Sequence, residues 1–109
     1  MAKAINFEYN GVPYVLEFTR ETVSTMEKQG FNLDDIDNKP ATIIPTLFAG
    51  AFMANHKHTS KKIIDAIYEK LTNKHDLIVR LAEMYNEPIE TMLADKESEE
   101  GNVEWGTSW

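Results

Sequence analysis

The sequence contains no cysteine, which excludes disulfide bonds and thiolate metal ligands. No apolar run reaches the roughly 18 to 20 residues that span a bilayer, and the opening segment MAKAINFEYNG lacks the apolar core of a signal peptide. We therefore expect a cytoplasmic protein with no membrane partner. The five glycines are isolated from one another, so no glycine-rich loop is present to hold a phosphate group.

Basic side chains are also few, since 11 lysines and arginines stand against 18 aspartates and glutamates, a net charge of −7. Binding to a nucleic-acid backbone needs clustered Lys and Arg, so no nucleic-acid partner is expected. Residues 95–109 carry five acidic side chains and one lysine, a net charge of −4, which leaves −3 for residues 1–94. We predict one globular domain over residues 1–94 and a flexible, disordered acidic tail over residues 95–109.

The segment AINFEYNGVPYVLEF predicts a β-hairpin. Asn10-Gly11 is a preferred two-residue turn, because both central positions need positive φ. Folding about it pairs residues whose numbers sum to 21 and gathers the apolar side chains on one face. These side chains are Ile5, Phe7, Tyr9, Val12, Tyr14 and Leu16. Pro13 opposes Glu8 at a non-hydrogen-bonded position, where it leaves the ladder intact and discourages a third strand on its own edge.

Helical signals follow the hairpin. Thr19 is predicted to cap a helix over roughly residues 20–29. Gly30 and Phe31 would close that helix with a left-handed residue and a Schellman contact. A single helical turn is expected over residues 33–36.

The segment ATIIPTLFAGAFMANH predicts an almost entirely apolar helix over residues 43–54, capped by Thr42. Two amphipathic helices follow, one from Thr59 or Ser60 and one from Asp76. Pro88 would end or kink the second of these, and Asn86 could cap a last segment that carries the apolar residues Ile89, Met92 and Leu93. The predicted fold class is α+β, mainly α, with an N-terminal β-hairpin packed on a cluster of four to five helices.

No set of residues predicts catalysis. His56 and His58 would diverge by about 200° around a helix, and with only His75 elsewhere a tetrahedral metal site is hard to assemble. The segment LDDID lacks the glycine and the distal glutamate of a calcium loop, and no serine lies in a nucleophile elbow. We expect no catalytic residue, no metal, no cofactor and no enzymatic activity.

The remaining features concern protein binding. A helix that is apolar all round is either a core helix or covered by a partner. Its partner-facing anchors would be Phe48, Phe52 and Met53. Trp105 and Trp109 lie four residues apart on the tail and are typical anchor residues. The tail either docks on a partner or folds back on its own domain.

Three segments together resemble the small tail assembly chaperones of long, non-contractile-tailed phages. They are FEYNGVPYVLEFTRETVSTMEKQGF, KPATIIPTLFAGAF and IYEKLTNKHDLIVRLAEMYNEPIETML, and they cover about residues 4–93 without the tail. The resemblance implies a non-enzymatic factor in the host cytoplasm that keeps the phage tape-measure protein soluble during tail assembly and is absent from the mature virion. It also implies self-association, and contact with the tail tube protein through a frameshifted longer form.

Two alternatives stay open. A structural phage connector or tail completion subunit would share the same absence of catalytic residues. A small hydrolase or metal-dependent enzyme would rest only on the HKH segment and the abundant carboxylates.

Overall fold

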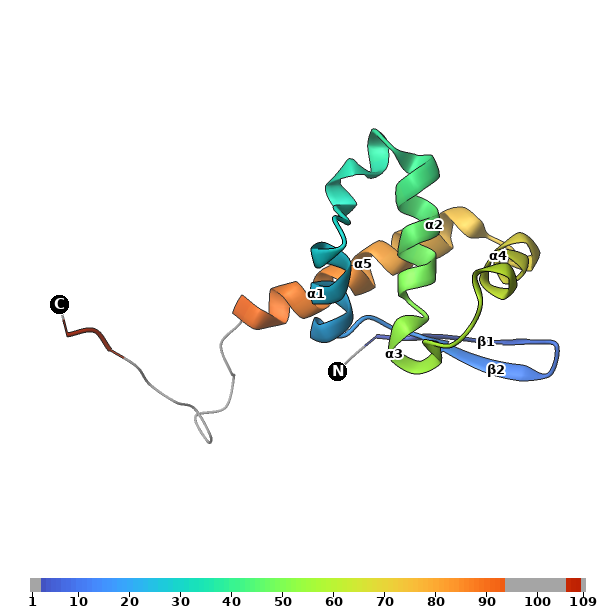
Figure 1. Ribbon diagram of the computed structural model, residues 1–109, viewed down its shortest axis with the longest axis horizontal. Coiled ribbons are helices and arrows are strands. Elements are labelled where there is room, and N and C mark those ends of the chain that lie inside the picture. The colour runs from blue at the N-terminus through green and yellow to red at the C-terminus, as the bar shows by residue number, and fades with distance from the viewer. Residues whose placement is uncertain (1–2, 94–105, 109) are drawn as a thin grey trace.

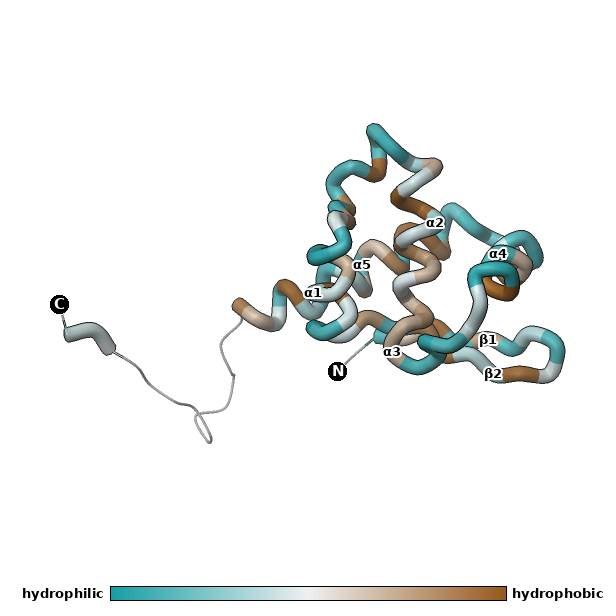
Figure 2. The backbone as a smooth tube through the Cα atoms, viewed as in Figure 1, coloured by the Kyte–Doolittle hydropathy of each residue, from teal (hydrophilic) through white to brown (hydrophobic). Residues whose placement is uncertain are grey.

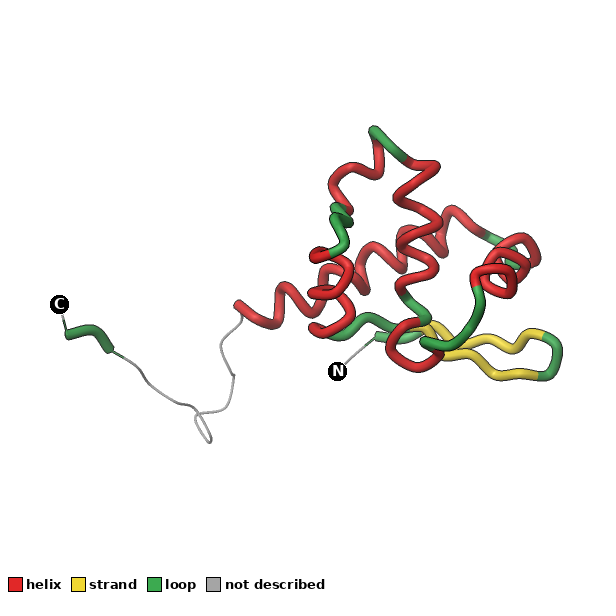
Figure 3. The backbone as a smooth tube through the Cα atoms, viewed as in Figure 1, coloured by secondary structure: helices red, strands yellow, loops and turns green. Residues whose placement is uncertain are grey.

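The computed structural model describes residues 3–93 and 106–108 (Figure 1). Its elements are β1 (Ile5–Tyr9), β2 (Val12–Leu16), α1 (Arg20–Lys28), the 3₁₀ turn η1 (Leu33–Asp37), α2 (Pro40–Gly50), α3 (Met53–His56), α4 (Lys61–Lys70) and α5 (Lys74–Leu93). Figure 3 shows the helices gathered on one side of the hairpin. The predicted fold class, mainly α with an N-terminal hairpin, is confirmed. The predicted tail falls almost entirely outside the described residues.

The hairpin has the predicted turn and register. Asn10 and Gly11 adopt φ angles of 50° and 79°, as a two-residue turn of this hand requires. Phe7 lies opposite Tyr14, and Glu8 lies opposite Pro13. The Phe7 and Tyr14 rings stack with centroids 5.4 Å apart, so the pairing also orders the apolar face.

Both ends of α1 are closed as its sequence predicts. The Thr19 hydroxyl oxygen accepts a hydrogen bond from the N–H of Thr22 at 3.1 Å, and the Thr22 hydroxyl oxygen accepts one from the N–H of Thr19 at 2.8 Å. At the other end Gly30 has a φ of 91°, and the N–H of Phe31 donates to the carbonyl of Met26 at 3.0 Å. This is the Schellman closure, which turns Phe31 back toward the core.

The apolar helix differs from its predicted bounds. It begins at Pro40 rather than after Thr42, because proline at the first helical position has its φ already set and needs no hydrogen bond there. It ends at Gly50, and the N–H of Ala51 bonds both three and four residues back. The carbonyl of Ala51 accepts a hydrogen bond from the N–H of Glu17 at 3.1 Å. A contact with the hairpin strand therefore replaces the continuation of the helix.

The last helix also differs from prediction. It begins at Lys74, directly after Asn73, which takes a left-handed φ of 55°, rather than at Asp76. It runs through Pro88 to Leu93, so Pro88 does not end it and Asn86 does not cap a separate segment. Three buried side chains in the turns before the proline hold the helix against the domain, and this packing outweighs the one hydrogen bond that proline removes.

The core lies where α2 meets the hairpin, α4 and α5. Aromatic rings dominate it: Phe48 contacts Phe52 and Tyr68 edge-on, at centroid distances of 5.2 and 5.0 Å, and Phe52 contacts Tyr14 at 5.8 Å. A second cluster places Tyr85 between Phe18 and Phe31. Figure 2 shows hydrophobic residues along both α2 and α5. No helix in the described part of the chain has the length and hydrophobicity needed to cross a membrane.

Candidate protein-binding site

The end of α5 extends beyond the domain (Figure 1), and it carries exposed apolar side chains. Met92 is 62% exposed and Leu93 is 86% exposed. Figure 2 shows this end of the helix as hydrophobic up to its last described residue. Two adjacent apolar side chains in water at a helix end are a candidate contact for another protein.

A groove connects this helix end with α1. We call it the α1–α5 groove: its apolar floor consists of Val23 from α1 and Pro88, Ile89 and Met92 from α5, and it has a volume of about 350 Å³. Val23 is buried, so the floor is continuous with the domain core. Apolar residues at positions 88, 89 and 92 recur with helical spacing, which matches a groove that receives another helix.

The rim of the α1–α5 groove is more acidic than basic. Glu21 and Glu27 lie on it, against Arg20 alone. Beneath this rim, burial raises the pKa of the Tyr85 hydroxyl, and the Glu27 carboxylate raises it further. The groove therefore combines an apolar floor with a negatively charged border.

A smaller cleft of about 250 Å³ continues past Pro88 and Arg20 toward the N-terminus of the chain. Lys3 and Glu87 face each other across it, with 3.8 Å between Nζ and Oε2. That distance is an ion pair but too long for a hydrogen bond, and Glu87 Oε2 is buried without a hydrogen-bond partner among the described residues. The two charges of the pair balance each other, so the pair leaves the net charge of this end of the groove unchanged.

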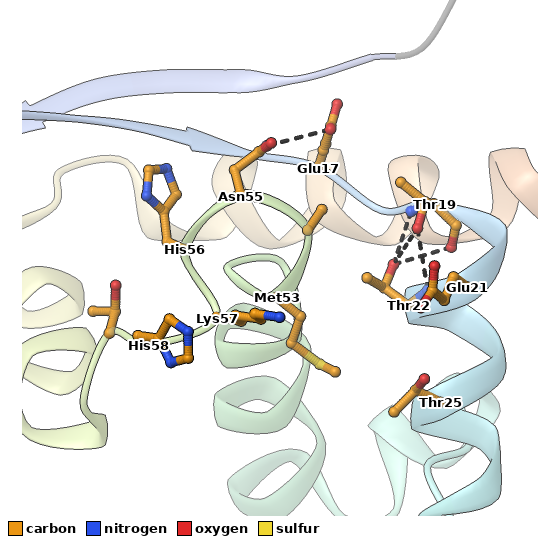
Figure 4. Close-up of a pocket in the computed structure, with 12 residues that line it drawn as sticks. Glu17, Thr19, Glu21, Thr22, Thr25, Met53, Asn55, His56, Lys57 and His58 are labelled. Carbon is orange, nitrogen blue, oxygen red and sulfur yellow. Dashed lines mark hydrogen bonds between the residues drawn. The ribbon is translucent and has the colours of Figure 1, made fainter.

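The largest cleft lies elsewhere, between the start of α1 and the segment that follows α3 (Figure 4). Its volume is about 810 Å³, and its lining is rich in threonine and histidine. Several of its polar groups already serve the fold: His56 Nε2 accepts the N–H of Val15 at 2.9 Å, and Asn55 Nδ2 donates to the carbonyl of Val15 at 3.2 Å. Figure 4 shows His56 directed toward β2 and His58 on another side of the segment.

This cleft contains no arrangement that we can assign to a reaction. The hydroxyls of Thr19 and Thr22 belong to the capping of α1, and no histidine in the cleft is hydrogen-bonded to a hydroxyl among the residues described. Within residues 3–93 and 106–108, no three His, Asp or Glu side chains lie close enough to hold a metal ion. The α1–α5 groove is therefore the better candidate site.

The predicted anchor residues Phe48, Phe52 and Met53 do not form one exposed surface for a partner. Phe48 is 2% exposed and Phe52 is 1% exposed, so both belong to the core and offer no surface to a partner in this fold. Ile43, Leu47 and Phe48 form the buried face of α2, whereas Ala41, Pro45 and Thr46 are exposed, so this helix has one core-facing side. Met53 is half-buried at the edge of the large cleft. Trp105 and Trp109 lie outside the described residues.

Sequence reasoning missed the α1–α5 groove because it assigned Ile89, Met92 and Leu93 to a separate last segment and gave them no contact with α1. A signal was present: these are the last apolar residues at helical spacing, and only the acidic tail follows to cover them. The position of Val23 on the groove floor depends on how α1 and α5 pack, which no local pattern specifies.

The fold and this groove define a small, mainly helical domain with an exposed apolar surface. The chain belongs to the family described as a domain of unknown function (DUF5055), whose profile matches residues 1–109. No curated protein and no solved structure is detectably similar to the chain.

Proposed function

We propose that this protein is a non-enzymatic assembly chaperone that binds a long helical client and keeps it soluble. In the class of phage proteins that the sequence resembles, this client is the tape-measure protein. The observation that carries the proposal is the exposed apolar end of α5, which continues into the α1–α5 groove. A long helical protein that has not yet been packed presents apolar stripes, and a groove of this kind can cover one turn or two of such a stripe.

Each such contact would be weak. A groove floored by four apolar side chains buries a small area, well below the roughly 800 Å² per partner of a stable interface. Met92 suits a client whose sequence varies along its length, because its unbranched thioether side chain adapts to different neighbours. Many copies on one long client would then act together, since linked weak contacts reinforce one another.

The remaining parts of the proposal are taken from the resemblance to phage tail assembly chaperones. The protein would act in the host cytoplasm, would be absent from the mature virion, and would contact the tail tube protein only through a longer, frameshifted form. The net charge of −7 supports a soluble coat, because like charges limit uncontrolled association of many copies.

Co-expression with the tape-measure protein of the same genome tests the proposal. The double substitution Met92→Asp and Leu93→Asp should lower the soluble fraction of the client at least about threefold, because each charge removes an apolar contact. Val79→Asp is a matched control on the same helix, since Val79 is 42% exposed and lies away from the groove. The client should stay soluble with this variant.

Two results would contradict the proposal. Equal solubilisation by the wild type and by the Met92 and Leu93 double variant would show that the groove is not the binding site. Stoichiometric presence of the protein in purified particles would favour a structural connector instead.

A further inference from the structure

The two strands of the hairpin have two outer edges, and the main-chain groups on these edges can be counted. A two-residue turn makes Tyr9 and Val12 a hydrogen-bonded pair, and the pairs then alternate along the ladder. Asn6 and Glu8 of β1 therefore lie at non-hydrogen-bonded positions, and their N–H and C=O groups point away from β2. Pro13 and Val15 occupy the corresponding outward positions on β2.

The outer edge of β2 is closed by the protein itself. Pro13 has no N–H to offer. The N–H of Val15 donates to His56, and its carbonyl accepts from Asn55. Figure 4 shows β2 lying between β1 and these two side chains. No further strand can add to this side.

The outer edge of β1 is open. No hydrogen bond among the described residues uses the outward main-chain groups of Asn6 or Glu8, and both side chains are exposed. Natural sheets usually protect such an edge with proline, lysine, a bulge or a covering element. β1 contains no proline, no lysine and no bulge over Ile5–Tyr9.

We propose that β1 pairs with β1 of a second copy of this chain, antiparallel and with Asn6 of one copy opposite Glu8 of the other. In this register the outward groups of both residues face each other, and four main-chain hydrogen bonds form about a two-fold axis. The Asn6 amide then lies beside the Glu8 carboxylate of the other copy on the polar face. Ile5, Phe7 and Tyr9 continue one apolar face across the new sheet.

The charge of Glu8 and the small number of strands in the sheet favour a second copy of the chain as the partner of β1, and the same charge favours this register. In the neighbouring register, Glu8 of one copy would lie opposite Glu8 of the other. Repulsion between the two carboxylates disfavours that register. A two-stranded hairpin is marginal by itself, and pairing converts it into a four-stranded sheet. The acidic tail is a poor alternative occupant, because its net charge of −4 would lie next to Glu8.

Engineered cysteines test the register, since the natural chain has none. A hydrogen-bonded antiparallel pair has Cα atoms about 5.5 Å apart, within the range that a disulfide spans. Mixing Asn6→Cys protein with Glu8→Cys protein should give a heterodimeric disulfide at least about fivefold faster than either variant alone. The Val79→Cys variant is the control, because its rate of disulfide formation measures random collision between copies. A faster reaction of Glu8→Cys with itself, or a mixed reaction no faster than that of Val79→Cys, would overturn the proposal.

A proline substitution tests the edge itself. Glu8→Pro removes an outward N–H and leaves the hairpin ladder intact, as Pro13 does on the opposite strand. Glu8→Gln is the matched control, because it removes the charge and keeps the N–H. Sedimentation equilibrium should show dimers for the wild type and Glu8→Gln and monomers for Glu8→Pro, whose folding is verified by circular dichroism. A monomeric wild type, or a dimeric folded Glu8→Pro, would contradict the pairing.

This inference does not depend on the proposed client. The cross-linking and sedimentation experiments use this chain alone. Loss of dimers would leave the client assay unaffected, and failure of the client assay would leave the dimer intact.

Discussion

His56 connects the helices to the hairpin through one ring nitrogen. Its Nε2 accepts the partly buried N–H of Val15 at 2.9 Å, and its ring packs on Tyr14 at a centroid distance of 4.9 Å. His56→Ala leaves that N–H without its acceptor and should lower the free energy of unfolding by about 1–3 kcal/mol in urea denaturation. His58→Ala is the control, with an expected loss below about 0.5 kcal/mol because His58 is exposed. Equal losses in the two variants would contradict this role.

Tyr85 makes stability depend on pH in the alkaline range. Burial, and then the Glu27 carboxylate, raise the pKa of its hydroxyl above the ordinary value of 10.0. As the pH rises past that value, Tyr85 ionises in the unfolded chain while the folded chain keeps its proton, so the free energy of unfolding falls. Urea denaturation between about pH 9 and pH 11 should show this decline. Tyr85→Phe should decline less, and an identical decline would exclude Tyr85 as a cause.

Elements set by neighbouring residues could be predicted, and elements set by distant contacts could not. The hairpin depends on two turn residues, and α1 depends on a capping box and a closing glycine, so a few adjacent positions decide them. The break after α2 depends on a hydrogen bond from Glu17 to Ala51, which are 34 positions apart. Likewise, α5 passes through Pro88 because the core holds the preceding turns. Single-sequence rules do not contain such contacts.

The approach of α2 to α1 depends on Gly50. A Cβ atom at this position would lie 2.5 Å from both Sδ and Cε of the buried Met26. We expect Gly50→Ala to lower the free energy of unfolding by at most about 1 kcal/mol, because the flexible end of Met26 can move aside in part and alanine favours the helix more than glycine does. In a Met26→Ala background the same change should cost less, which a double-mutant cycle in urea would measure. Additive losses would contradict direct contact between the two positions.

At the scale of the whole molecule, the turn signals and the spacing of apolar residues predicted the fold class but not the site. The apolar surplus of the helix over residues 43–54 indicated either core or interface, and only the packing of elements distant in sequence places Phe48 of α2, and Phe52 just after it, in the core. The α1–α5 groove needs side chains from two helices, and its nearest lining residues in sequence, Glu27 and Pro88, are 61 positions apart, so it has no local pattern. The open outer edge of β1 could be predicted in part, because the predicted register already defined which residues of β1 have main-chain groups that point outward.

Net charge should oppose the pairing of two copies. Each chain carries −7, so salt that screens this repulsion should strengthen the dimer. Between about 20 mM and 500 mM NaCl we expect the dissociation constant from sedimentation equilibrium to fall by about threefold or more.

Removing residues 95–109 should have the same effect at low salt and should reduce the dependence on salt, because these residues carry −4 of the total. The opposite result, a weaker dimer without the tail, would mean that Trp105 and Trp109 contribute to the contact between copies. The double substitution of both tryptophans by alanine distinguishes the two cases, since it removes the rings and keeps every charge. A tail that acts only through its charge predicts that this variant associates as the wild type does.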